Sequence, residues 1–152
     1  MEIFFLERPM KKYLAFLVAV SATIYTNSAL ACSVPNNTSP QTREMVSQQG
    51  GWPISDAKCD FLNKNGLSIF VTTRATVLSG VTVGWADVML IDNNNVVSDQ
   101  EQGSTTVNSA AQPSMDLAQQ LAYSSLKTAI NALDFEKAAS EIRKYQKSAK
   151  AK

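Results

Sequence analysis

Residues 67–106, rich in Val, Thr and Ile and interrupted at two places by turn-forming residues, constrain the fold of this chain more than any other feature. The interruptions are Ser79-Gly80 and Asn93–Asn95, residue types that favour tight turns. The segments between them carry the β-branched residues that strands prefer. We therefore predict three strands, at about 67–78, 81–91 and 96–106, joined as an antiparallel meander. The third segment is polar and charged, which suits an exposed edge strand.

Four helices are predicted outside this region, two before it and two after it. Each begins after a polar residue that can cap a helix N-terminus. These residues are Ser39, Ser55, Ser114 and Asp134. The first two helices end at glycine-containing pairs, Gly50-Gly51 and Asn65-Gly66. The order α-α-β-β-β-α-α separates helices from strands, so we predict one α+β domain over residues 32–152 whose basic tail, 147–152, is frayed.

A two-residue hairpin loop at Ser79-Gly80 would fix the pairing of the first two strands. Leu78 would then oppose Val81, and side chains would alternate between two faces of the sheet. One face is small and apolar in its middle, which would let a helix approach closely, and we assign it to the core. Its residues are Leu67, Ile69, Val71, Ala75, Val77, Gly84, Ala86, Val88 and Leu90.

The opposite face carries the candidate binding residues. The predicted register places Arg74 opposite Trp85 and diagonal to Asp87, with Phe70 and Met89 on the same face. Tryptophan and arginine are enriched in binding hot spots, so these five residues form a candidate recognition patch. Two other interpretations remain open. A helix could cover this face, or Asp87 could act as a general acid partnered by Asp99 or Glu101 on the third strand.

The N-terminal residues 1–31 have the features of a signal peptide. Lys11 and Lys12 precede an apolar run at 13–25, and Ala29-Leu30-Ala31 is a cleavage site of the small-x-small type. The apolar run is shorter than the roughly 20 residues that span a bilayer. Because Met10 lies directly before the two lysines, we expect either that translation starts at Met10 or that residues 1–9 are an inert extension.

Cys32 directly follows this cleavage site and has two alternative fates. Ordinary signal-peptide cleavage would leave Cys32 and Cys59, an even cysteine count that implies a disulfide in an oxidising compartment. Such a bridge would contribute about 3–4 kcal/mol to stability. The segment "SALAC" also matches, loosely, the lipobox motif that precedes a lipidated cysteine in bacterial lipoproteins. In that case Cys32 would carry the lipid of an outer-membrane lipoprotein.

The composition excludes several kinds of site and partner. The chain has no histidine, which rules out Ser-His-Asp and Cys-His catalysis and removes the commonest zinc ligand. We expect no metal and no cofactor. Beyond residue 31 the acidic and basic residues are equal in number, so the domain is neutral and we expect no nucleic-acid partner.

These observations favour a small exported bacterial binding or accessory module, periplasmic or secreted, that acts by protein–protein contact. We do not expect an enzyme. The alternatives are a lipoprotein tethered through Cys32, which is the only route to a membrane, and, more distantly, a carboxylate-based hydrolase. A homodimer that extends the narrow sheet is a further expectation about partners.

Overall fold

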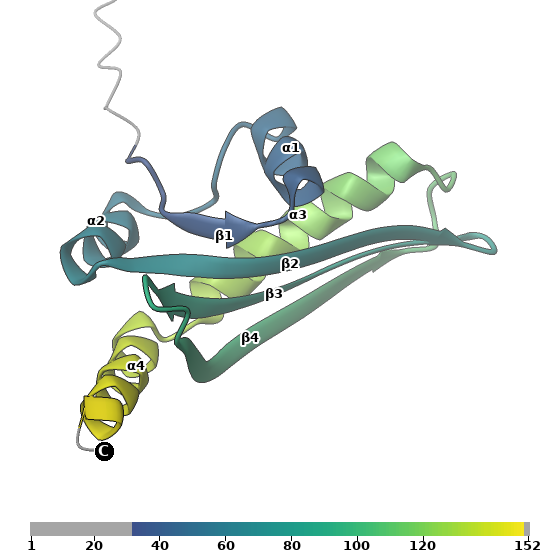
Figure 1. Cartoon of the computed structure of the whole chain (residues 1–152). Coiled ribbons are helices and arrows are strands. Elements are labelled where there is room, and N and C mark those ends of the chain that lie inside the picture. The colour runs from purple at the N-terminus through teal and green to yellow at the C-terminus, as the bar shows by residue number, and fades with distance from the viewer. Residues whose placement is uncertain (1–31, 151–152) are drawn as a thin grey trace, which may run out of the picture. The chain divides into compact units, whose positions relative to one another are not determined.

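The structure, a computed structural model, describes residues 32–150, and the predicted signal peptide at 1–31 lies outside them. Four helices accompany one sheet (Figure 1). The elements in chain order are β1 Asn36–Thr38, α1 Pro40–Gln48, α2 Asp56–Asn65, β2 Leu67–Leu78, β3 Val81–Asp92, β4 Val97–Asn108, α3 Met115–Ala132 and α4 Phe135–Lys150. The α+β class and the four helices are confirmed. Residues 147–150, expected in a frayed tail, lie in α4.

The sheet has four strands rather than the three predicted, and it is mixed rather than purely antiparallel. Its order is β1-β2-β3-β4, and β1 runs parallel to β2. The Ile69 N–H donates to the carbonyl oxygen of Pro35 at 3.0 Å, and the Thr38 hydroxyl donates to the Val71 carbonyl oxygen at 2.9 Å. The sequence Asn-Asn-Thr has no strand pattern of its own. Its extended form therefore depends on pairing with a distant segment.

The predicted β2–β3 register is confirmed along its whole length. Leu78 pairs with Val81 across the Ser79-Gly80 turn, and Arg74 pairs with Trp85. Gly80 has φ +75°, a backbone angle that favours glycine. The third predicted strand began one residue early and ended two residues early, since β4 spans Val97–Asn108. Its pairing with β3 is irregular between Met89 and Ile91, where the Ser98 hydroxyl accepts a hydrogen bond from the Leu90 N–H at 3.1 Å.

The predicted capping residues all act as caps. The side chains of Ser39, Ser55 and Ser114 accept hydrogen bonds from backbone N–H groups in the first turns of α1, α2 and α3. The Asp134 carboxylate does the same for α4, accepting from the Lys137 N–H at 3.0 Å. These bonds satisfy donors that a helix start leaves unpaired.

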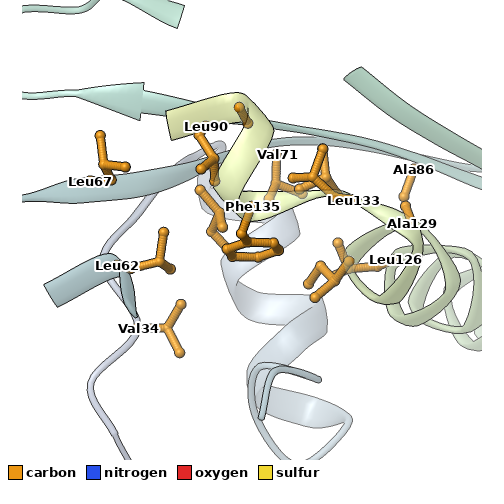
Figure 2. Packing of buried hydrophobic residues seen from close by; sticks show 14 of the residues in the cluster. Val34, Leu62, Leu67, Val71, Ala86, Leu90, Leu126, Ala129, Leu133 and Phe135 are labelled. Carbon is orange, nitrogen blue, oxygen red and sulfur yellow. The ribbon is translucent and has the colours of Figure 1, made fainter. Parts of the chain in front are cut away.

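The hydrophobic core lies between the sheet and the helices (Figure 2). It joins the predicted core face of β2 and β3 to buried residues from all four helices. Gly84 is the point of closest approach, because a Cβ there would overlap the backbone nitrogen of Ala122 in α3. The expectation that small residues in the middle of this face admit a helix is therefore confirmed. Only Val77, near the hairpin tip, is exposed on this face, at 38 %.

Two contacts tie α2 into this core. The predicted disulfide joins Cys32 to Cys59, with the Cα atoms 6.1 Å apart. Lys58 extends across to the end of α3, where its ammonium donates to the Ile130 carbonyl oxygen at 2.5 Å and lies 4.5 Å from the centre of the Phe135 ring. Burial lowers the pKa of Lys58. A cation at this position complements the partial negative charge of a helix C-terminus.

Candidate functional site on the open face of the sheet

The helices pack against one face of the sheet and leave most of the other face uncovered. The residues of β2 and β3 in the core cluster all belong to the predicted core face: Leu67, Ile69, Val71, Ala86, Val88 and Leu90. Ile91, at the end of β3, is the one buried hydrophobic residue of these two strands on the opposite face, at 6 % exposure. Phe70, Trp85 and Met89, which alternate with them, do not take part in the core cluster of the described residues. Figure 1 shows α3 lying along the sheet on its own side of β2 and β3. We call the uncovered side the open face.

The five candidate residues lie together on this open face. Arg74 pairs with Trp85, and Phe70 pairs with Met89, on adjacent strands. Asp87 lies between these two pairs, opposite Thr72 on β2 and Gly103 on β4. Arg74 is exposed and the other four side chains are half-buried. The register places them as neighbours, because residues opposite one another on adjacent strands have Cβ atoms about 5 Å apart.

A shallow hollow of about 490 Å³ lies beside the indole of Trp85. Asp87 and Gly103 form part of its lining, with Ser104 and Thr105. A Cβ at Gly103 would lie 2.5 Å from the Asp87 carboxylate, so the glycine leaves room for that side chain. Gly103 was missed as a site residue. An isolated glycine within a strand signals a close approach of this kind, and it could have identified the position.

Arg74 does not stack on Trp85, although the two residues lie opposite one another. Among residues 32–150 the one cation–π contact is that of Lys58 with Phe135. The indole face of Trp85 is therefore not occupied by a cation from β2. The register places Arg74 and Thr105 directly opposite Trp85 on the open face, with Thr72 and Thr76 diagonal to it.

Aliphatic residues extend the open face toward the hairpin tip, and these too were missed. Leu78 is 59 % exposed and Val107 is 58 % exposed. Val83 lies between them, paired with Thr76 on one side and Val107 on the other. Val107 escaped notice because the third strand was predicted to end before it. With Phe70, Trp85 and Met89, these residues give the open face apolar side chains near both ends, and polar residues such as Thr72 and Asp87 lie between them.

The carboxylates of the third strand do not assemble a catalytic pair. The Tyr145 hydroxyl of α4 donates to the Asp99 carboxylate at 2.5 Å, and this bond raises the pKa of Tyr145. Glu101 pairs with Met89 and is thus diagonal to Asp87 on the open face. In the described part of the chain, no three His, Cys, Asp or Glu residues lie close enough together to hold a metal ion.

Among the residues that the structure describes, Asp92 is the carboxylate with the most hydrogen bonds, and its role is structural. It accepts hydrogen bonds from the Asn94 and Val96 backbone N–H groups, both at 2.8 Å, and from the Gln146 amide at 2.6 Å. Burial alone would raise the pKa of Asp92, but the bonds from Gln146, Val96 and Asn94 outweigh it and lower the pKa. These bonds fix the β3–β4 turn and attach α4 to it.

Comparison with known proteins places this chain in no family. No family model matches it, and no curated protein matches it. A solved structure described as a "putative lipoprotein" from Caulobacter crescentus CB15 is similar over 77 % of this chain and 87 % of its own, with 15 % sequence identity and a TM-score of 0.31. A likeness at this TM-score assigns neither fold nor function. Within residues 32–150, no helix has both the length and the apolar character needed to cross a bilayer.

Proposed function

We propose that this protein is a small exported binding module that holds a protein partner on the open face of its sheet. One observation carries the proposal. The helices cover one face of the sheet only, and the half-buried Trp85, Phe70 and Met89 lie together on the other. Aromatic residues and methionine are enriched at the centres of protein interfaces. An apolar surface beside charged Arg74 and Asp87 has the composition of a hydrophobic interface centre with a polar rim.

Export is supported by the disulfide. Bridges of this kind persist in the periplasm and outside the cell and are rare in the cytoplasm. Cys32 has one sulfur atom, which cannot form both a disulfide with Cys59 and a thioether to lipid. The Cys32–Cys59 bridge therefore favours the soluble periplasmic or secreted form over the lipoprotein. The lipoprotein alternative rests on the sequence "SALAC" and would leave Cys59 as a free thiol.

A carboxylate-based hydrolase has less support than a binding module. The prediction paired Asp87 with Asp99 or Glu101. The Asp99 carboxylate instead accepts a hydrogen bond from Tyr145 of α4. Glu101 is exposed, and the half-buried Asp87 lines a shallow hollow rather than a deep cleft. Catalytic carboxylates generally need an enclosed site that shifts their pKa values.

Two measurements test the proposal. Intact mass of the protein purified from the periplasm should match a disulfide-bonded chain that begins at Cys32, without lipid. Capture experiments from periplasm and culture medium should then compare the wild-type protein with the Trp52→Phe variant. In that variant Trp85 is the only tryptophan. Its fluorescence should shift when a captured partner is added back, because partner contact would exclude water from the indole.

An unchanged emission spectrum on addition of a partner that binds would place that partner elsewhere on the molecule and contradict the proposal. A diacylglyceryl adduct at Cys32 would contradict the soluble form and favour the tethered alternative, while leaving the binding face to be tested by the same fluorescence measurement.

A further inference from the structure

Most of β2 has a neighbouring strand on one side only. β1 pairs with Ile69, Phe70 and Val71, and α1 then begins at Pro40 (Figure 1). The remaining segment, Thr72–Leu78, pairs with β3 but with no strand of the described residues on its other side. We call Thr72–Leu78 the free edge of β2.

The backbone of this free edge presents a regular row of donors and acceptors. Alternate residues of a strand direct their N–H and C=O groups to opposite edges. The Ile69 N–H and the Val71 carbonyl bond toward β1. By the same alternation, the backbone groups of Thr73, Ala75 and Val77 point to the side that no described strand covers. Such groups are a template for a further strand.

The opposite edge of the sheet is more fully protected than the free edge of β2. α1 contacts the free edge at Thr73, whose hydroxyl shares a hydrogen bond of 2.8 Å with the Thr42 hydroxyl. At the start of β4, the Glu141 carboxylate accepts a hydrogen bond from the Gln100 N–H at 2.9 Å, and the irregular pairing at Ser98 bends the strand. Asp99 and Glu101 add negative charge there. Bulges and charges of this kind prevent unwanted pairing. The free edge of β2 has no proline, no acidic residue and one charge, Arg74.

A groove of about 690 Å³ follows this free edge. Its walls include Thr42 and Met45 of α1 and Met115 and Gln119 of α3, with Thr73 and Ala75 along β2. Met115 is 52 % exposed and Val77 is 38 % exposed, although both lie on the side of the sheet that carries the core. The groove therefore has room and apolar surface for side chains from a strand added at this edge.

We propose that the strand that occupies this edge is the same segment of a second copy of the chain. Two free edges would pair antiparallel around a two-fold axis at Ala75 and join two sheets into one. Thr73 would then lie opposite Val77 of the second copy, and Arg74 opposite Thr76 of the second copy. The three pairs whose groups face the edge would form about six backbone hydrogen bonds. Val77 of each copy would enter the groove beside Thr73 of the other.

This register is favoured over its neighbours by charge and by length. Moving the axis one residue earlier, to Arg74, would place the two arginines directly opposite each other, which is destabilising. It would also bring Val77 against Val71, a position that β1 already occupies. The axis at Ala75 uses the whole free edge and opposes no like charges. A self-complementary interface of this kind is typical of two-fold dimers. The inference does not depend on the function proposed for the open face.

Light scattering on the full mature protein tests the dimer. We expect a mass twice that of the monomer, and we expect Ala75→Pro to restore the monomer mass. Proline at 75 removes an N–H that faces the free edge and leaves the β2–β3 ladder intact. Thr105→Pro is the matched control, since it places proline at an edge-facing position of β4, and it should remain dimeric. Circular dichroism should show both variants folded.

A crosslink tests the register independently of folding. Cysteines at Ala75 would face each other across the axis, about 5.5 Å apart between Cα atoms, within the range of a disulfide. Ala75→Cys should give a covalent dimer on oxidation, and the more exposed Leu78→Cys should not. A wild-type protein that remains monomeric up to its solubility limit would overturn the inference. So would a dimer that Ala75→Pro leaves intact, or an Ala75→Cys protein that fails to crosslink.

Discussion

At the scale of single residues, two glycines in neighbouring strands do different things. Gly84 lies under α3, and a side chain there would meet the rigid backbone of Ala122. Gly103 lies on the open face, and a side chain there would meet the terminal carboxylate of Asp87, which can move. One glycine therefore sets the distance between helix and sheet, and the other shapes the hollow beside Trp85.

Substitution of these glycines should separate the two roles. We expect Gly84→Ala to lower the free energy of unfolding by about 1–3 kcal/mol, the typical cost of forcing extra atoms into a well-packed core. Gly103→Ala should cost much less, because a side chain can rotate away. Urea unfolding of both variants beside the wild type measures the difference. Equal costs would mean that α3 does not approach the sheet as closely as described.

Asp92 gives the protein a defined sensitivity to acid. Its hydrogen bonds hold the pKa of the folded protein below its ordinary value of 3.8. A group with a lowered pKa in the folded state contributes its full stabilisation above that ordinary value and loses it as pH falls through the folded-state pKa. Acidification below about pH 4 should therefore weaken the β3–β4 turn and the attachment of α4.

The variant Asp92→Asn should show this contribution as a difference between two pH profiles. At neutral pH we expect it to be less stable than the wild type by about 1.5–3 kcal/mol, the range for hydrogen bonds to a charged group. Below pH 4 the gap between the two urea midpoints should narrow. Asp56→Asn, at an exposed site in the first turn of α2, is the control. A gap that stays constant with pH would show that the Asp92 charge is not responsible.

At the scale of elements, those with local signals were predicted and those without were not. The hairpin register followed from one two-residue turn, and the helix starts followed from capping residues such as Ser39 and Ser114. β1 could not be predicted, because it is held by backbone bonds to β2 across a long sequence separation. The irregularity at Ser98 was missed for the same reason, since it is visible only in the pairing of β3 with β4.

The grouping of the candidate site residues on one face could be predicted from the sequence. Side chains alternate between the two faces along β2 and β3, and this alternation grouped Trp85 with Arg74, Asp87, Phe70 and Met89. Which face the helices cover depends on tertiary packing, and the small residues Gly84 and Ala86 were the local clue. Arg74 lies opposite Trp85 without stacking on it, because the register of two strands does not determine side-chain rotamers.

The disulfide attaches the segment before β1 to α2, and its removal should weaken the whole domain. We expect the double variant Cys32→Ser, Cys59→Ser to lose about 3–4 kcal/mol of unfolding free energy, less any strain that the bridge carries. Urea unfolding of the oxidised, reduced and double-variant proteins measures this. Reduced wild type and double variant should agree. A double variant as stable as the oxidised protein would mean that the bridge does not constrain the unfolded chain as supposed.

At the scale of the whole described domain, the distinguishing feature is a sheet covered on one side only. α4 lies at one end of the sheet and the β2–β3 hairpin tip at the other (Figure 1). Between them, the open face exposes aromatic and aliphatic side chains that a monomer would normally bury or replace with polar ones. This surface distribution is the reason for proposing a binding module. Pairing through β2 would place two such faces side by side on one continuous sheet.

The most direct test of this account is the Trp85→Ala variant, measured for both partner binding and stability. If Trp85 is a recognition residue, its removal should weaken capture of the partner by at least about 2 kcal/mol, a roughly thirtyfold loss of affinity. The urea midpoint should fall only modestly, because the side chain is half-buried and outside the core. A buried structural tryptophan would instead cost about 3–5 kcal/mol of stability. A collapse of the urea midpoint with unchanged affinity of the folded fraction would contradict the account.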